Sequence, residues 1–575
     1  MIRVSSEPIK LKDVLEGNYY TVPLYQREFS WEIEEVSDLF HDIFDASEEH
    51  FFGTILLAQE SDGTNRYEII DGQQRLMTLL LLLSAIRTIL IEESKKSNKP
   101  DEIYNKGLEQ LLFSIPTTFA PIATNTSFEP RFKANKRDHN LFCTVIKGGE
   151  PQPTKSLKSH LKIAAAYNYL YDNINSMKIK EGISAIHKFL DKIILKSKFI
   201  KMTTENNADK VLLFKALNAR GLELTKADLV KNEICRHRKN LEIEEAIELW
   251  DDIRVTIEHA GANIDNFLYH YINSLERAND IRKKIAENRS SQQSDKIYYP
   301  PIPEKYLFDA YEYELKNSTD TRIFLNEIKE ASGHYSSFAK PPKDAYHLLA
   351  LKELNASRCY PLLLHAKRIL SEKDFKKLCL AIEILTFRHS TIIQRDAKEL
   401  ETFYYQLIEL LKTNQSLHLL LDNIKKHASV TNDGLFKQAF LTASPKISVS
   451  KFILHKIISS MEESVDIKQD IHLEHIMPQT PSGEWKKLAE TEENQEKYKE
   501  YLNRLGNLTI ILDRWNRTMS NKDYVEKIPL YDKSRITITK EIPTKWKTWN
   551  YKTIDERQEF LYEYASKIWT ADKIK

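Results

Sequence analysis

The pattern of apolar and polar positions predicts a mostly helical chain with two small strand-containing regions. The longest apolar run, Leu76 to Ile91, is interrupted by Arg87. It is shorter than the roughly 20 residues that a membrane helix needs, so it predicts a buried helix and no membrane span. Before it, "FFGTILL" (51–57) and "RYEII" (66–70) flank the turn-forming "SDGTN", which predicts a β-hairpin.

Helical patterns fill most of residues 157–275 and resume after a polar, proline-rich segment at 287–306. Thr225 and Asp228 have the spacing of a capping box and predict a helix start. Helical patterns continue to about residue 430. Two strand-like segments, "DIHLEHIMPQ" and "LGNLTIIL", then precede a helical tail.

Composition indicates a well-cored chain in a reducing compartment. The 575 residues are 41% hydrophobic and 29% charged, and they include only 14 glycines, which favours helix. The net charge of +1 neither supports nor excludes a local nucleic-acid-binding face. The four cysteines have no zinc-binding or disulfide spacing, and the N-terminus lacks a signal-peptide pattern. We therefore expect a cytoplasmic protein.

The segment Asp71-Gly72-Gln73-Gln74-Arg75 joins a predicted strand to the apolar helix. The first N–H groups of a helix lack intrahelical partners and favour anions. Arg75 could form bidentate hydrogen bonds with a phosphate. Asp71 could hold a metal ion or orient water, and the two glutamine amides could contact a base or sugar edge. The alternative is a plain N-cap aspartate beside exposed polar residues.

A second group of polar residues lies at Glu474-His475-Ile476-Met477-Pro478. Phosphodiester hydrolysis needs a base for water and a divalent ion that neutralises charge. Glu474 and His475 leave opposite faces of a regular strand, so a bulge would be required to bring both to one phosphate. His475 is the last histidine, and Asn507 and Asn516 are the later candidates. Asparagine oxygens suit Mg²⁺ or Mn²⁺.

"VPLYQREFSW" (22–31), "YEIIDGQQRLMTLLLL" (67–82) and "FKALNARGLELTKADLVKN" (214–232) together resemble the N-terminal domain of GmrSD-type modification-dependent (type IV) restriction proteins. That domain is similar to the ParB/sulfiredoxin-like fold and to SspE-like and BrxU-like defence proteins. The resemblance implies nucleoside triphosphate binding and hydrolysis, with GTP, UTP, ATP and CTP unresolved. The implied nucleotide-binding residues are Asp71, Gly72, Gln73, Gln74, Arg75, Tyr25, Gln26 and Arg27.

The segment from Glu474 to Pro478, with Trp485, "LGNLT" (505–509) and Asn516, resembles the HNH (His-Me finger) nuclease domain at the C-terminus of the same family. The resemblance implies that His475 is the general base and that Asn507 orients it or supports the hairpin. It also implies Glu474 and Asn516 as metal ligands, with Asn521 as the alternative to Asn516.

Together these features predict a mainly α chain with small α+β parts. Residues 1–235 would be a ParB-like nucleotide-binding domain, residues 236–440 a helical middle region, and residues 441–575 a ββα-metal HNH nuclease domain. The expected function is a nucleotide-dependent endonuclease that senses modified double-stranded phage DNA, with dimerisation as one route to cutting both strands. The alternative is a nucleotide-regulated DNA-binding sensor with an inactive, structural HNH domain.

Overall fold

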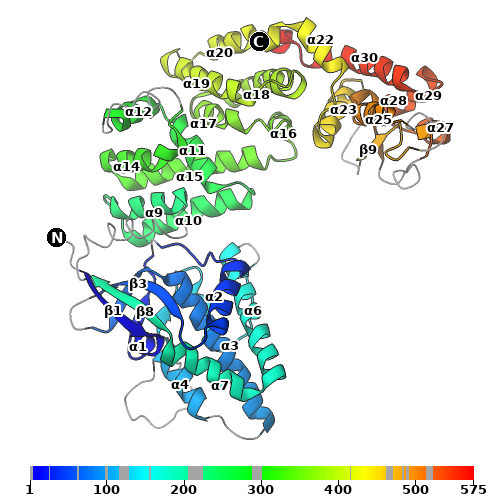
Figure 1. Ribbon diagram of the computed structural model, residues 1–575. Helices are drawn as coiled ribbons and strands as arrows, with labels where there is room; N and C mark the ends of the chain where they lie inside the picture. The colour runs from blue at the N-terminus through cyan, green and yellow to red at the C-terminus, as the bar shows by residue number, and fades with distance from the viewer. Residues whose placement is uncertain are drawn as a thin grey trace. The chain divides into compact units, whose positions relative to one another are not determined.

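The computed structural model (Figure 1) describes most of the chain in two compact units, Met1–Glu248 and Leu249–Lys575. The described residues are 4–24, 26–60, 64–97, 102–114, 129–154, 157–204, 225–287, 301–414, 416–461, 471–481, 485–486, 491–512 and 522–575.

The first unit is built on a mixed six-stranded sheet with the order β1-β8-β3-β4-β2-β7. β3 and β4 pair antiparallel, which confirms the predicted hairpin. β8 pairs parallel with β3 and antiparallel with β1, and the sequence did not indicate it. The strands are β1 (Val4–Lys10), β2 (Tyr19–Thr21), β3 (Phe51–Gln59), β4 (Arg66–Asp71), β7 (Phe132–Lys133) and β8 (Lys198–Thr204), with a separate pair β5 (Phe113–Ser114) and β6 (Glu129–Pro130).

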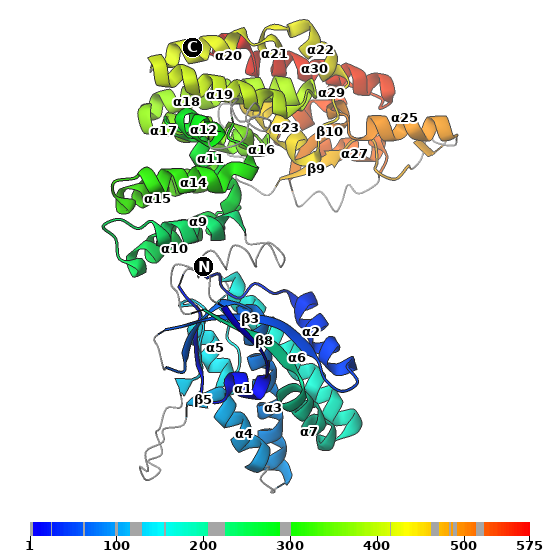
Figure 2. The same cartoon turned by 60° about the vertical axis from the view of Figure 1, so that its left-hand side comes forward.

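The apolar run forms the central helix of this unit, α3 (Gln73–Ser97), as predicted. Its leucines from Leu79 to Leu83 are at most 3% exposed. Burying one such side chain stabilises the fold by about 1.5–3 kcal/mol. Figure 2 shows α3, α6 and α7 side by side against the sheet. The helices are α1 (Leu11–Leu15), α2 (Ile33–Asp45), α3, α4 (Glu102–Leu112), α5 (His139–Ile146), α6 (Lys158–Glu181), α7 (Ile183–Asp191) and α9 (Lys226–Arg236).

The turn before α3 depends on glycine. β4 ends at Asp71 and α3 begins at Gln73, so the predicted strand–turn–helix is confirmed. Gly72 has φ +92°, a conformation that other residues rarely adopt. A Cβ atom there would also lie 3.3 Å from Ile55 Cγ1. The α9 capping box between Thr225 and Asp228 is likewise present.

Packed helices make up most of the second unit, in agreement with the predicted helical middle region (Figure 1). α11 packs on α14 and α17, while α16 and α20 both pack on α18. The helices are α10 (Ile243–His259, shared with the first unit), α11 (Ile264–Ser274), α12 (Ala278–Glu287), α14 (Leu307–Asn317), α15 (Thr321–Ala339), α16 (Tyr346–Glu353), α17 (Tyr360–Ile369), α18 (Glu372–Thr386), α19 (Ala397–Asn414), α20 (Leu417–Lys426), α21 (Ala428–Thr431), α22 (Asp433–Leu441) and α23 (Ile447–Met461).

The C-terminal part of the second unit contains one strand pair and five helices among the described residues. β9 (Ile471–His475) pairs antiparallel with β10 (Leu508–Leu512), which confirms the two predicted strands. The helices are α25 (Glu492–Leu502), α27 (Tyr524–Tyr531), α28 (Thr537–Lys540), α29 (Ile542–Lys545) and α30 (Tyr551–Ile568).

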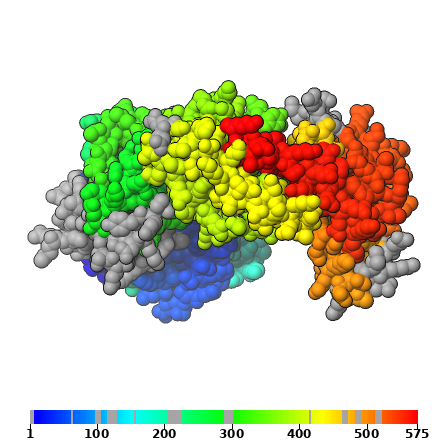
Figure 3. Space-filling view, turned by 90° about the horizontal axis from the view of Figure 1, so that it is seen from above, coloured from blue at the N-terminus to red at the C-terminus, as the bar shows by residue number. Residues whose placement is uncertain are grey.

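Helix α30 joins this part to the middle region. It packs on α22 and α23, and Figure 3 shows the red C-terminal segment lying along the yellow helices. Trp569, which follows α30, is fully buried and stacks on Phe387 with ring centroids 3.7 Å apart. Its Nε1 atom donates to Glu383 Oε1 at 2.9 Å. Trp569 therefore anchors the end of the C-terminal part on the helical region.

The predicted fold class, mainly α with small α+β parts, is confirmed. The ParB-like and ββα-metal assignments and the three domain boundaries stay predictions. In the part of the chain that the structure describes, every helix is too short or too polar to cross a membrane.

Candidate functional site: a histidine-bearing strand pair and a strand–turn–helix motif

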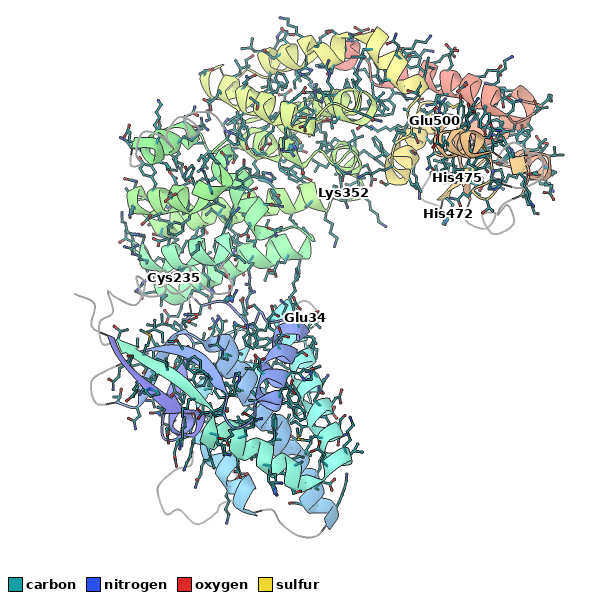
Figure 4. The ribbon with its side chains drawn as sticks, viewed as in Figure 1. Glu34, Cys235, Lys352, His472, His475 and Glu500 are labelled. Carbon is teal, nitrogen blue, oxygen red and sulfur yellow. The ribbon has the colours of Figure 1, made fainter. Side chains whose placement is uncertain are left out.

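The C-terminal site is centred on His475, the last residue of β9. Register is regular along the strand pair, with His475 opposite Leu508 and Glu474 opposite Thr509. Neighbouring side chains of a regular strand leave opposite faces. The bulge that would bring both side chains to one phosphate is therefore not found between residues 471 and 475. Figure 4 labels His475 together with His472 on the same strand.

Among the described residues, the imidazole ring of His475 has one polar contact. Its Nε2 atom lies 3.0 Å from Oδ1 of Asn503, the residue that caps the C-terminus of α25. The ring is 8% exposed. Burial lowers the pKa of His475, the hydrogen bond to Asn503 raises it, and the charge of Lys527 lowers it further. The net lowering of the pKa favours the neutral ring, which is the form that accepts a proton.

Asn507 has the contacts of a residue that supports the hairpin. It is fully buried, and its Oδ1 atom accepts from Met477 N at 2.7 Å and from Trp549 Nε1 at 3.1 Å. Its Nδ2 atom donates to Leu502 O at 2.9 Å. Of the two roles predicted for Asn507, these contacts correspond to hairpin support, while the ring of His475 is contacted by Asn503.

Glu474 faces a buried lysine. Lys527 Nζ lies 2.7 Å from Glu474 Oε1 and also donates to the carbonyl oxygens of His475 and Ile476 at 2.6 and 3.3 Å. The lysine side chain is 0% exposed. Burial raises the pKa of Glu474 and lowers that of Lys527, and the opposite charge of each partner counteracts both shifts.

This arrangement bears on the expected metal site. The Glu474 carboxylate is paired with the Lys527 ammonium group, on the strand face opposite His475. As placed, Glu474 therefore does not fit a ligand role next to the histidine. Asn516 and Asn521 lie outside the described residues. The ligand roles of Glu474 and Asn516 stay predictions.

The N-terminal site is a segment, residues 26–30, held against the start of α3. Gln73 Nε2 donates to the carbonyl of Arg27 at 3.0 Å. Gln74 Nε2 donates to the carbonyl of Glu28 at 3.0 Å, and Gln74 Oε1 accepts from Ser30 N at 2.8 Å. From the sequence, both glutamine amides could contact a base or sugar edge. In the structure, these hydrogen bonds of the two side chains are made to backbone atoms. Gln73 Oε1 is buried and has no partner among the described residues.

Further polar side chains help to hold residues 26–30, which we call the clamped segment. Gln26 Nε2 donates to the carbonyl of Ile70 at 2.8 Å. Asn135 Nδ2 donates to the carbonyl of Gln26 at 2.8 Å, and Asp138 Oδ2 accepts from Phe29 N at 2.7 Å. Neither Asn135 nor Asp138 was predicted from the sequence, although both lie in the polar run "NKRDHN" (135–140).

Arg75 extends from the first turn of α3 toward β3. A Cβ atom on Gly53, which has φ +84°, would lie 3.0 Å from Arg75 Nη1, so glycine leaves room for the guanidinium. Arg75 Nη1 donates to Thr54 O at 3.4 Å. Burial lowers the pKa of Arg75, and the charge of Asp71 raises it. A partly buried cation thus lies beside Asp71 at the start of α3.

The third N-terminal motif, residues 214–232, contains Asp228. Burial raises the pKa of Asp228 on α9, whereas hydrogen bonds to Thr225 and the charge of Arg27 lower it. Arg27 is therefore close enough to Asp228 for its charge to act on this carboxyl, which links the first and third N-terminal motifs. Tyr25 lies outside the described residues.

The structure thus has two candidate sites. The first unit carries the strand–turn–helix motif with its clamped segment, and the second unit carries a histidine at the end of a strand. Comparison with known families gives the class of the protein. A sequence model described as "GmrSD restriction endonuclease, N-terminal domain" matches residues 11–235, and one described as "GmrSD restriction endonucleases, C-terminal domain" matches residues 430–564. The chain belongs to the GmrSD restriction endonuclease family and has the role of a type IV restriction endonuclease that acts on DNA. No curated protein matches the chain.

Proposed function

We propose that the chain is a nucleotide-dependent endonuclease that senses modified double-stranded phage DNA and cuts it with His475 as the general base. The observation that supports this most strongly is the His475 ring itself. It ends a strand and accepts or donates one hydrogen bond at Nε2, and burial lowers its pKa, which favours the neutral ring. A neutral imidazole at a fixed position is suited to general base catalysis.

In the proposed reaction, a ring nitrogen of His475 takes a proton from water. The water oxygen forms a bond to phosphorus, the bond from phosphorus to the leaving sugar oxygen breaks, and that oxygen takes a proton from solvent. When bound, a divalent ion, Mg²⁺ or Mn²⁺, would neutralise charge on the phosphate. Membership of the family suggests such a metal dependence in general terms. Because Glu474 faces Lys527, no step is assigned to its carboxylate.

The N-terminal unit would bind the nucleoside triphosphate. Three features around the start of α3 support this proposal: the partly buried Arg75 cation, the Asp71 carboxylate, and the unpartnered Oε1 atom of Gln73. Arg75 would bind a phosphate, Gln73 Oε1 would accept from a base or ribose donor, and Asp71 would orient water. Gln26 and Gln74 would hold the segment that carries Arg27.

One observation favours the second candidate, a nucleotide-regulated DNA-binding sensor with a structural HNH domain. Glu474, which the resemblance assigns to metal binding, forms an ion pair with Lys527. Under this alternative, the buried pair stabilises a domain that binds DNA without cutting it.

The test that separates these candidates is incubation of the purified chain with modified and unmodified phage DNA. Reactions contain Mg²⁺ or Mn²⁺ and each of the four nucleoside triphosphates or none. We expect cutting of modified DNA that depends on both nucleotide and metal. DNA binding without any cutting under all conditions would support the sensor instead.

A further inference from the structure

The contact between His475 and Asn503 indicates which ring nitrogen carries the proton. Asn503 presents its side-chain oxygen, Oδ1, to His475 Nε2 at 3.0 Å. An amide oxygen can only accept a hydrogen bond. With the amide in this orientation, the neutral ring donates from Nε2, which leaves the lone pair on Nδ1 free to accept a proton.

We propose that Asn503 is a positioning residue for the nuclease reaction, which holds the His475 ring in the orientation and tautomer in which Nδ1 is the base. This inference rests on the proposed nuclease function of His475. Asn503 is not in the motif that carries the family resemblance. It precedes "LGNLT", and 28 positions separate it from the histidine.

Neighbouring residues hold the segment that carries Asn503 in place. Its own N–H group bonds to Tyr501 O at the end of α25. The next residue, Arg504, is buried, donates to Asp555 Oδ1 at 2.7 Å, and lies over the Tyr501 ring at 3.8 Å. Asn507 holds the preceding residue through Leu502 O. The segment that carries Asn503 is thus anchored on both sides, which favours a fixed position of its amide.

Asn507 cannot supply the same contact. Its oxygen already accepts from Met477 N and Trp549 Nε1, and its nitrogen donates to Leu502 O. An orienting acceptor is valuable because it prevents the opposite tautomer, in which the proton sits on Nδ1 and the ring cannot act as a base there.

The direct test is ring-nitrogen NMR of the full chain labelled with ¹⁵N-histidine, with the His475→Ala spectrum used to assign the His475 signals. In the wild-type protein, we expect the proton on Nε2 and an unprotonated Nδ1. In Asn503→Leu, the hydrogen-bonded Nε2–H signal should be lost or shifted. A wild-type ring protonated on Nδ1 would overturn the proposal, whether or not the protein cuts DNA.

A second readout separates orientation from folding. Asn503→Leu should cut DNA about tenfold or more slowly, since loss of a whole general base costs about 10²–10⁴-fold. Asn503→Asp, which restores an acceptor oxygen of the same shape, should recover most of that rate, with melting temperature and DNA affinity unchanged in both variants. Wild-type cutting by Asn503→Leu, or equal loss in both variants, would refute the role of Asn503. Undiminished cutting by His475→Ala would instead refute the nuclease assignment itself.

Discussion

Lys527 Nζ lies 2.7 Å from Glu474 Oε1 on the underside of the strand that ends in His475, and it also binds the carbonyl oxygen of His475 itself. One fully buried ammonium group thus connects helix α27, the acid and the backbone of the proposed base. Taking two charges out of water is costly, so a pair this deep is sensitive to the loss of either partner.

We expect Lys527→Met to lower the free energy of unfolding by about 3–5 kcal/mol, because it leaves the Glu474 carboxylate buried and unpaired. The double variant with Glu474→Gln should be less destabilised than the sum of the two single variants, by about 0.5–3 kcal/mol. Denaturant unfolding of all four proteins measures this coupling. As a control, Lys552→Met in the exposed pair with Glu556 should cost under about 1 kcal/mol.

The same variants distinguish a structural role of Glu474 from a metal-ligand role. If Glu474 only pairs with Lys527, Mn²⁺ titrations followed by electron paramagnetic resonance should show similar affinity for the wild type and the double variant. A large loss of Mn²⁺ affinity in folded Glu474→Gln would establish the ligand role instead.

Asp138 should make the stability of the first unit depend on pH. Burial raises the pKa of this carboxyl from 3.8 to about 6, against the lowering effect of its hydrogen bonds to Ser159 and Phe29. Between these two values the folded state binds a proton that the unfolded chain has released. The stability contributed by Asp138 is therefore present below about pH 3.8 and is lost as the pH rises through about 6. The penalty at neutral pH is on the order of 3 kcal/mol.

Urea unfolding at pH 4.5 and pH 7 measures this effect. Asp138→Asn should show a flatter change in stability over that interval than the wild type, because the neutral amide does not titrate. The exposed Asp172→Asn variant on α6 serves as the control and should keep the wild-type change. An unaltered pH profile in Asp138→Asn would contradict the assignment.

Gly506 should not tolerate a side chain. A Cβ atom there would lie 2.2 Å from the carbonyl oxygen of Ile554 in α30, which is backbone and cannot rotate away. Gly506→Ala should destabilise the C-terminal strand pair by at least the roughly 1–3 kcal/mol typical of overpacking. Gly333→Ala in α15, where the added atom meets open space, should instead leave stability unchanged or raise it by up to about 1 kcal/mol. Thermal unfolding compares the two variants, and equal melting temperatures would show that the turn can relax.

Arg75 and Asp71 should have separable effects if the start of α3 binds a nucleotide. Arg75→Ala should weaken nucleotide binding by about 1.5–3 kcal/mol, the range for charge-assisted hydrogen bonds. Asp71→Asn should bind nucleotide about normally and hydrolyse it slowly. Calorimetry and phosphate release measure both quantities, and Arg87→Ala, on the same helix, is the control. If neither variant changes binding or turnover, the helix start is only structural.

Local sequence patterns predicted the elements that depend on neighbouring residues. The β3–β4 hairpin, the turn at Gly72 and the capping box at Thr225 all follow from short-range rules, and the structure confirms each of them. β8 was missed because it is recognisable only through its partners, β1 and β3, which lie far away in the chain.

The polar contacts of the candidate sites were harder to predict for the same reason. Lys527 and Asn503 reach His475 across 52 and 28 positions, so no local spacing indicates them. The glutamines of the N-terminal motif were recognised as important. Their backbone partners at residues 27–30 lie about 46 positions away, which hid the clamping role.

The central claim is that His475 is the base that cuts DNA. Its most direct test is cleavage of modified phage DNA by the full chain with Mg²⁺ or Mn²⁺ and nucleotide, comparing wild type, His475→Ala and His472→Ala. The second histidine lies on the same strand and is exposed (Figure 4). We predict that His475→Ala loses about 10²–10⁴-fold in cutting rate while its melting temperature and nucleotide hydrolysis stay at wild-type values. His472→Ala should cut within a few-fold of wild type. Near-normal cutting by folded His475→Ala would contradict the account.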